Sequence, residues 1–445
     1  MKRRVLVTLI AGLLIANLFL GLRIQSLTAA GDDKEKDNAY KNIELLTRVM
    51  EIIRKDYVDD SHLSYQDLTY GALKGMLNEL DPHSQFMPPS NFDDMKQETG
   101  GQFGGIGVVI GMKDGIITII SPMEDTPGFK AGLLPGDKII RIDGKSTEKM
   151  ALPEVVKMLR GPPGSKVGLT ILRPKTREIK DISITRTTIK VDSVKDVKLV
   201  SDKIGYVRIT QFNEPTSDEL EKALLKLEKD GMNGLVIDLR NNPGGLLESA
   251  VDVVGKFLPK GELVVFTEGR NASVHSEYKV RESRTHPKYP IAVLINEGSA
   301  SGSEIVAGAL QDTKRAVIVG ETSFGKGSVQ SVLPLPDGSA IRLTTAKYYT
   351  PSKKVIHEHG ITPDITVPMS EEDWEQILTQ RRQSALEAVE DKEAPKPDAT
   401  PSTDKEPKEK SPPSEKGQSH DIQLERAIDL LKGINSYLQL RAASK

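Results

Sequence analysis

The chain has 445 residues, too many for a single hydrophobic core, and two or three domains with connecting segments are expected. Its 63 acidic and 61 basic side chains nearly cancel, which argues against a nucleic-acid-binding protein, because such proteins usually carry a strongly basic domain. There is no cysteine, which excludes thiol nucleophiles, thiolate metal sites and disulfides.

The N-terminus has the pattern of an export signal. Three basic residues, 2–4, precede an apolar run at 5–22, an order typical of a secretory signal. The run is close to the roughly 20 residues that cross a bilayer, so an uncleaved membrane anchor is the alternative; a buried core helix fits the flanking charge less well. Residues 1–30 are therefore predicted to be a signal or anchor, with the remainder in the periplasm or on the outer face of the inner membrane.

Residues 31–96 are predicted to be an N-terminal helical segment. Apolar residues recur at three- and four-residue spacing between residues 43 and 53. A second helical run covers residues 65–80, and Asp81-Pro82 ends it. A helical pair of this kind is typical of a packing or dimerisation element.

The composition changes between residues 97 and 186, where glycine, proline and β-branched residues are frequent. One helix is predicted at 151–160, among strands at 106–112, 115–120, 138–142, 166–173 and 178–186. We therefore expect an independent β-rich domain of roughly 90 residues.

Strands and helices alternate through residues 187–370. The predicted strands are 204–210, 234–240, 262–267, 291–296 and 316–320, and the predicted helices are 216–229, 246–257 and 303–311. Such alternation implies an α/β domain with a largely parallel sheet. A hairpin is predicted after it, with Pro336-Asp337-Gly338 between strands 328–335 and 339–348.

The chain is predicted to end in helical and flexible segments. A helical extension is expected at 371–390. A stretch rich in Pro, Lys, Glu, Ser and Asp at 391–420 is predicted to be a flexible linker, because it cannot bury enough apolar surface to become ordered. An amphipathic helix within 421–445 closes the chain, and the sequence does not indicate what it packs against.

Three serines gather where a predicted strand ends and a helix begins. Ser299, Ser301 and Ser303 follow the strand at 291–296, at the edge where open α/β sheets bind ligands. Unpaired N–H groups at a helix N-terminus favour developing negative charge, as acyl transfer requires. An ordinary capping box between Ser301 and Glu304 is the alternative interpretation.

A serine nucleophile needs a base. None of the seven histidines lies in a setting that suggests a triad, and residues 357–359 lack the helical spacing of a metal-binding HExxH motif. Lys326 lies between two glycines and could act as the base if burial lowered its pKa. Gln330 could then orient the amine. The same segment lacks the spacing of a phosphate-binding loop.

Two further segments could present backbone N–H groups. Gly244 and Gly245 follow the predicted strand 234–240 and could donate to an oxyanion, although a plain tight turn is the alternative. In the β-rich domain, the glycine-rich residues 103–108 are predicted to be a loop leading into a strand. Such a loop can bind a terminal carboxylate while a peptide adds to the sheet edge.

Taken together, these segments resemble the C-terminal processing peptidases, a family of PDZ-containing serine proteases. The resemblance covers about residues 40–370 and rests on LDPHS (80–84), FGGIGV (103–108), AGLLPGD (131–137), LRG (159–161), RNNPGG (240–245), SASGSE (299–304), GKGSVQ (325–330) and GITPD (360–364). It implies an α/β fold with a ClpP/crotonase-like core (187–370), an inserted β-rich PDZ domain (97–186) and helical N- and C-terminal segments.

The resemblance also implies roles for individual residues in a serine endopeptidase. Ser301 would be the nucleophile, Lys326 the general base and Gln330 its positioning partner. The oxyanion hole would use the N–H of Gly302, where the family often has alanine, and one from Gly244-Gly245, chiefly Gly245. The PDZ domain would capture the free C-terminus of a substrate through Gly104, Gly105, Ile106, Gly107 and Val108, and Arg160 would couple its position to protease activity.

The implied partners are proteins or peptides with accessible C-termini, with no metal, cofactor or nucleic acid. An adaptor or activator protein is compatible with this interpretation, and the helical ends favour a homo-oligomer. Two alternatives stay open: a periplasmic peptide-binding scaffold whose protease is silent, and a crotonase-type acyl-CoA enzyme on the same core. Hydrolysis that Ser301→Ala abolishes, with peptide binding retained, would exclude the first, and thioester substrates would test the second.

Overall fold

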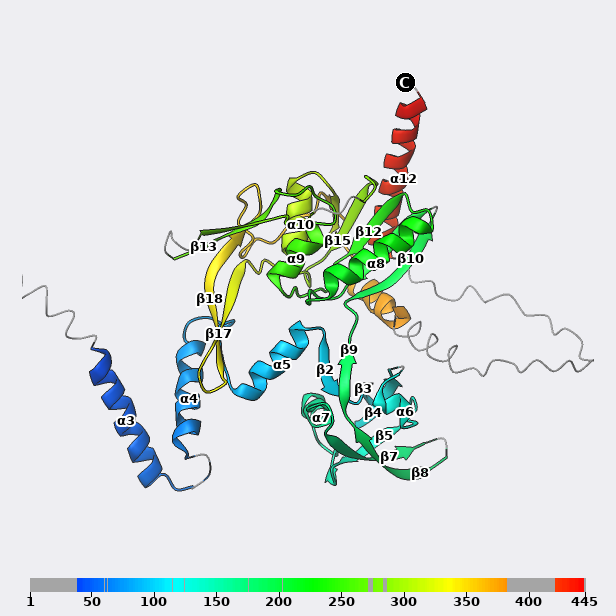
Figure 1. The fold of residues 1–445 in the computed structure, drawn as a ribbon. Helices are drawn as coiled ribbons and strands as arrows, with labels where there is room; N and C mark the ends of the chain where they lie inside the picture. Colours follow the sequence, from blue (N-terminus) through cyan, green and yellow to red (C-terminus); the bar gives the residue numbers. More distant parts are fainter. Residues whose placement is uncertain are drawn as a thin grey trace, which may run out of the picture. The chain divides into compact units, whose positions relative to one another are not determined.

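The computed structural model describes residues 38–381, except 60, 62, 114, 124, 175, 202, 271–274 and 283–285, and residues 421–443. The chain divides into two compact units, Met1–Phe86 and Met87–Lys445, whose elements are drawn in Figure 1. The predicted export signal or anchor at 1–30 and the predicted linker at 391–420 lie outside the described residues. In the described part of the chain, no helix is long and apolar enough to cross a membrane.

The described part of the first unit is helical, as predicted. It contains α3 (Ala39–Asp56) and α4 (Tyr65–Asn78). Each helix begins at a polar cap: the side chain of Asn38 accepts the N–H of Tyr40, and the side chain of Ser64 accepts the N–H of Asp67. Strand β1 (Gln85–Met87) follows.

The second unit is built around a six-stranded sheet with the order β10-β11-β12-β15-β16-β19. All neighbouring strands are parallel except the β10–β11 pair, so the prediction of a largely parallel sheet is confirmed. The strands are β10 (Val194–Ser201), β11 (Ile204–Ile209), β12 (Gly234–Asp238), β15 (Ile291–Ile295), β16 (Val317–Gly320) and β19 (Ile365–Thr366).

Helices cover both faces of this sheet (Figure 1). Leu235 and Ile237 point to one face, where they pack in the core that includes α8 (Thr216–Lys229), α9 (Leu247–Val254) and α10 (Gly302–Asp312). Val236 points to the other face, where it packs with Ala427 and Leu431 of α12 (Ile422–Ala443). The last helix of the chain is thus part of the core, and residues 371–381 are also helical.

An antiparallel sheet stands beside the parallel one. The predicted hairpin is present as β17 (Ser328–Pro334) and β18 (Ala340–Tyr349), with Gly338 at φ +85° in its turn. Strand β18 also pairs with β13 (Leu263–Gly269), and β13 pairs with β14 (His275–Lys279). This hairpin begins two residues after Lys326 and therefore fixes the course of the chain that follows Lys326.

The β-rich region has a hydrophobic core of its own, which includes Ile119, Ile139 and Val167. Its sheet has the order β3-β4-β5-β7-β8, with β6 paired to β5. The elements are β3 (Val108–Lys113), β4 (Ile116–Pro122), α6 (Pro127–Lys130), β5 (Lys138–Ile142), β6 (Lys145–Ser146), α7 (Leu152–Leu159), β7 (Lys166–Arg173) and β8 (Glu178–Thr185).

The chain enters and leaves this region through a short antiparallel ribbon that the sequence did not predict. After α5 (Pro89–Thr99), strand β2 (Gln102–Gly105) pairs with β9 (Thr187–Lys190). The first half of the segment expected to be a glycine-rich loop is therefore a strand. Glycine disfavours strands intrinsically, so it is the ladder with β9, more than eighty positions along the chain, that holds this conformation.

Candidate active site

Ser301 lies in a sharp turn between β15 and α10. Its backbone adopts φ 53° and ψ −111°, a conformation that costs a non-glycine residue energy and is held only when the surroundings impose it. Ser299 and Ser303 are fully buried, and their hydroxyls donate to the carbonyls of Leu239 (2.8 Å) and Asn242 (2.9 Å). Ser301 is partly exposed, so it is the serine of the three that a substrate can reach.

Glu304 connects the turn that contains Ser301 (the serine turn) to residues 323–326 (the lysine loop). Its side chain is completely buried. One carboxylate oxygen accepts the N–H groups of Ser301 (2.8 Å) and Lys326 (3.0 Å). The other accepts the Ser323 hydroxyl (2.6 Å) and the Gly325 N–H (2.7 Å). Burial raises the pKa of Glu304, and these hydrogen bonds oppose part of that rise. Sequence reasoning saw this residue only as one end of a capping box.

Lys326 is half-buried in the loop between β16 and β17. Burial lowers the pKa of its amine, the nearby positive charge of Arg342 lowers it further, and the negative charge of Glu304 opposes the change. A lysine in such a setting loses its proton more readily than a solvated one. Within the described residues, no direct hydrogen bond joins the amine to the Ser301 hydroxyl. Catalytic hydrogen bonds are often long in the absence of substrate.

Tyr348, on β18, is a neighbour that the sequence did not indicate. Its side chain is buried and its hydroxyl donates to the Lys326 carbonyl. The side chain of Ser301 lowers the pKa of Tyr348, whereas burial raises that pKa more strongly. The phenol therefore stays protonated, bonded to the Lys326 backbone and near the side chain of Ser301. A tyrosine brought there by a strand pairing has no local sequence signal.

Gln330 lies four residues beyond Lys326 on β17, next to a register shift in the β17–β18 ladder. Its amide nitrogen donates to the carbonyl (3.1 Å) and hydroxyl (2.8 Å) oxygens of Ser328. The predicted contact with the Lys326 amine is not formed among the described residues. The side-chain oxygen of Gln330 is the atom that such a contact would use.

Two glycines of the β12–α9 loop lie close to other backbone: Gly244 lies against the turn that contains Ser301, and Gly245 lies against Phe212. Gly244 has φ +101°, and a Cβ atom added there would lie 2.6 Å from the Cβ of Ser301, so only glycine fits. The Gly244 N–H is already used, because it donates to the side chain of Asn242 (2.9 Å). No acceptor is found among the described residues for the N–H of Gly245 or for that of Gly302, at the start of α10. Of the three glycine N–H groups predicted for the oxyanion hole, those of Gly245 and Gly302 are therefore the two without a partner in the part of the chain that the structure describes.

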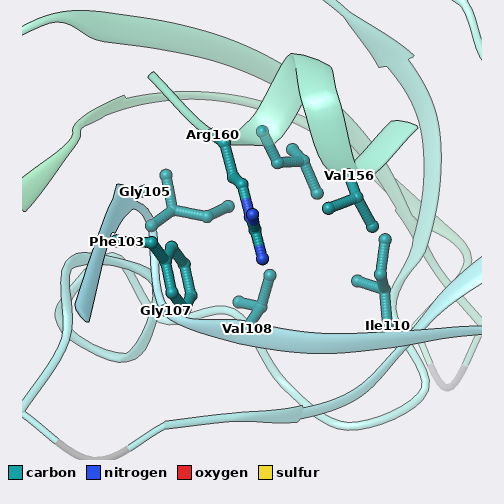
Figure 2. Close-up of a pocket in the computed structure, with 9 residues that line it drawn as sticks. Phe103, Gly105, Gly107, Val108, Ile110, Val156 and Arg160 are labelled. Carbon is teal, nitrogen blue, oxygen red and sulfur yellow. The ribbon is translucent and has the colours of Figure 1, made fainter. Parts of the chain in front are cut away.

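The predicted peptide-binding segment lines a groove of about 220 Å³ in the β-rich region. In Figure 2, α7 and strand β3 face each other across it, with Val156 opposite Ile110. Its lining is Phe103, Gly105, Ile106, Gly107, Val108, Ile110, Val156, Leu159 and Arg160. Gly104, also predicted, is not part of the lining: its N–H donates to the side chain of Gln97 (2.9 Å).

Arg160 stands at the end of α7 and reaches over this groove (Figure 2). Its guanidinium carbon lies 4.7 Å from the ring centre of Phe103. A partly exposed ion pair joins it to Glu98 of α5 (3.1 Å). The side chain is thus placed between the groove and the helix that precedes the β-rich region.

The loop at 357–359 packs on the segment that contains Lys326. The His357 backbone lies against Gly327, so closely that an added Cβ there would clash with the His357 nitrogen. Within the ranges that the structure describes, no group of three metal-binding side chains is arranged to hold an ion.

Comparisons with known proteins agree with these observations. The model of peptidase family S41 matches residues 203–367, and a PDZ domain model matches residues 118–173. The chain is 44% identical over 360 residues to a carboxy-terminal-processing protease of Bartonella bacilliformis, covering 79% of this chain and 81% of that one. It is 36% identical over 383 residues to the carboxy-terminal processing protease CtpB of Bacillus subtilis, covering 82% and 78%.

One similar solved structure is the photosystem II D1 C-terminal processing protease, with 30% identity and a TM-score of 0.43. The match covers 73% of this chain and 92% of that one. Together with the sheets and helices described above, the family matches confirm the predicted fold class, an α/β core with an inserted PDZ domain and helical terminal segments.

Proposed function

The chain belongs to peptidase family S41, the carboxy-terminal processing serine peptidases, and on this premise we propose that it cleaves proteins with a Ser301/Lys326 dyad after its PDZ domain has captured their C-termini. The observation that carries the proposal is the Glu304 carboxylate, which holds the backbones of Ser301 and Lys326 on one oxygen atom. The lowered pKa of Lys326 supports its role as the base.

The proposed chemistry is acyl transfer. Neutral Lys326 takes the proton of Ser301 while the serine oxygen attacks the scissile carbonyl carbon. The carbonyl oxygen becomes an oxyanion, which the N–H groups of Gly302 and Gly245 stabilise. Lys326 then gives the proton to the leaving amine as the C–N bond breaks. A water molecule, deprotonated by the same lysine, attacks the acyl-enzyme, and the lysine returns that proton to the Ser301 oxygen as the acyl group is released as a carboxylic acid. Gln330 would orient the amine through its side-chain oxygen.

For substrate capture we assign the N–H groups of Gly105–Val108 to the terminal carboxylate, with the peptide added beside β3. The groove is lined mainly by aliphatic side chains, so an apolar C-terminal residue is the best fit. Gly104 is left out of this assignment, because its N–H is occupied by Gln97. Coupling through Arg160 remains part of the proposal, supported by the ion pair with Glu98.

The remaining features of the proposal concern location and assembly. The basic and apolar pattern of residues 1–30 supports export, by a cleaved signal or a retained anchor. No residue of α3 is buried, and Ile43, Val49 and Ile52 on it are exposed, which supports association into a homo-oligomer or with an adaptor. The domain limits 97–186 and 187–370 are also retained as part of the proposal.

The test is proteolysis of an unfolded model protein by the chain lacking residues 1–30. Ser301→Ala and Lys326→Ala should abolish cleavage while each still binds a peptide with an apolar C-terminus. Lys347→Ala, which removes an exposed lysine on β18, is the matched control and should cleave like the parent. Cleavage by the Ser301→Ala variant would overturn the dyad. If no form cleaved but all bound peptide, the silent-scaffold alternative would replace it.

A further inference from the structure

Arg240 lies immediately before residues Asn241–Gly245, which we call the oxyanion loop because Gly245 is assigned to the oxyanion. Its side chain is completely buried and has two acidic partners. Asp238, two residues earlier, accepts from its Nε (3.0 Å) and from one terminal nitrogen (2.8 Å). Asp421 accepts from both terminal nitrogens, each at 2.8 Å. The oxygen of Gln423 accepts a further hydrogen bond at 3.1 Å. Asp421 and Gln423 belong to the far end of the chain.

Helix α12 delivers these two side chains. It lies on the parallel sheet (Figure 1), and Ala427 and Leu431 are fully buried there. Asp421 caps its first turn by accepting the N–H of Leu424 (3.0 Å). At the other end of the contact, Asn435 donates to the side chain of Asn233 (3.1 Å). The carboxylate of Asp421 is therefore in place only when α12 is docked.

The charges of this buried cluster balance only with Asp421 present. Asp238 also binds a second guanidinium, that of Arg381 (2.9 Å), and accepts the Tyr206 hydroxyl (2.7 Å). Two arginines thus face two aspartates. Removing the Asp421 charge would leave two guanidinium groups on a single buried carboxylate, and an uncompensated buried charge is strongly unfavourable.

Arg240 directly precedes the Asn241–Gly245 loop, which ends at the glycines assigned to the oxyanion. Its own N–H donates to Asp238 (2.9 Å), and the N–H of Asn241 donates to Asn296 (2.8 Å) beside the serine turn. Asn242 continues the connection, because its carbonyl accepts the N–H of Ala300 (3.0 Å). A shift of Arg240 would therefore move the loop relative to the serine.

We propose that Asp421 is a positioning residue for hydrolysis: docking of α12 brings its carboxylate to Arg240, and Arg240 then holds the Asn241–Gly245 loop in the geometry that binds the oxyanion. The C-terminal helix thereby becomes a condition for catalysis without contacting the substrate. The inference rests on the proposed function, because that assigns the oxyanion to Gly245.

The experiment compares Asp421→Asn, Asp421→Glu and the matched control Asn435→Ala in the same protein, with Ser301→Ala alongside. For Asp421→Asn we expect kcat to fall about 10- to 100-fold, less than the roughly 100- to 1,000-fold loss that follows removal of an oxyanion donor. KM and the affinity of the PDZ groove for a C-terminal peptide should not change. Asp421→Glu should recover part of kcat, and Asn435→Ala should keep the parental value.

A double-mutant cycle tests whether Asp421 acts through Arg240. The effects of Asp421→Asn and Arg240→Lys on kcat should be strongly non-additive. If Asp421→Asn does not fold, Gln423→Ala replaces it, with a smaller expected loss. Parental kcat in Asp421→Asn, or equal losses in Asp421→Asn and Asn435→Ala, would overturn the inference. Hydrolysis by Ser301→Ala would instead overturn the proposed function, and the inference with it.

Discussion

Replacing Glu304 by glutamine tests whether this buried carboxylate sets both the geometry and the proton affinity of the site. Glutamine keeps the size of the side chain but has one acceptor oxygen in place of two. The carboxylate now accepts four hydrogen bonds from the serine turn and the lysine loop. The variant must therefore lose some of them, and it also loses the negative charge.

The expected loss of stability depends on which hydrogen bonds a glutamine side chain can form in place of the Glu304 carboxylate. Its oxygen can keep the N–H groups of Ser301 and Lys326, which share one carboxylate oxygen. Its amide nitrogen then faces Ser323 and Gly325. The Ser323 hydroxyl, which already accepts the N–H of Ile361 (2.7 Å), can turn to accept from the amide, but its own proton then loses its acceptor, as does the Gly325 N–H. One unsatisfied buried donor costs about 1–3 kcal/mol, so the free energy of unfolding in urea should fall by at least that amount.

The catalytic effect has a defined direction. The charge of Glu304 raises the pKa of Lys326, so its removal lowers that pKa further and leaves more of the lysine neutral at a given pH. The acidic limb of the kcat/KM profile, which reports the base in the free enzyme, should move to lower pH. Profiles between about pH 5 and 9 cover the range below the ordinary lysine pKa.

Glu297→Gln is the matched control, because it removes an exposed carboxylate from the same loop. It should leave both the stability and the acidic limb unchanged. An acidic limb that stayed at the parental pH in Glu304→Gln, or that moved equally in Glu297→Gln, would show that Glu304 does not set the charge state of Lys326.

Two further substitutions test the neighbours of the dyad. Gly302→Ala keeps the backbone N–H, but its Cβ would lie 2.9 Å from the Phe212 ring. The Phe212 N–H donates to the Gly244 carbonyl (2.9 Å), so a displaced Phe212 would also displace the loop that carries Gly244. We therefore expect a lower kcat in steady-state assays. An unchanged kcat would mean that the Phe212 ring moves aside without disturbing that loop. Tyr348→Phe removes the hydroxyl that contacts Lys326 and Ser301. Its loss should cost about 0.5–1.5 kcal/mol, seen as a several-fold lower kcat at unchanged KM, and parental kcat would contradict this.

The elements predicted well were those whose own sequence carries a strong pattern. Helix α8 has the predicted bounds, and strand β12 is present within the predicted 234–240, because amphipathic periodicity and a continuous apolar run are local signals. Strands β2, β9 and β10 were not predicted. Strand β10 is an edge strand with no buried residue, and β2 and β9 owe their conformation to each other. Pairing across long sequence distances leaves no such local mark.

The residues of the candidate site also fall into those that a local motif predicts and those that only tertiary contacts bring there. Ser301, Lys326 and the paired glycines were predicted by motif, but the residues alone did not say which of the three serines would be the nucleophile. The hydrogen bonds favour the prediction of Ser301, because the hydroxyls of Ser299 and Ser303 donate to backbone carbonyls. Tyr348 reaches the site from a neighbouring strand, and its position depends on a tertiary contact that no single segment encodes.

The packing site of α12 could have been inferred by asking which helices bury each face of the parallel sheet. The segments 234–238 and 291–295 are apolar almost throughout, the pattern of strands buried on both faces of a sheet. The helices that alternate with the strands, α8, α9 and α10, pack in the core on one face. The other face needed a further apolar partner, and the amphipathic helix at the chain end was one of the predicted helices to which the sequence assigned none. When this helix packs on the sheet, it brings Asp421 to Arg240. Covering the apolar face of the sheet therefore also supplies the second carboxylate of the charge cluster next to the oxyanion loop.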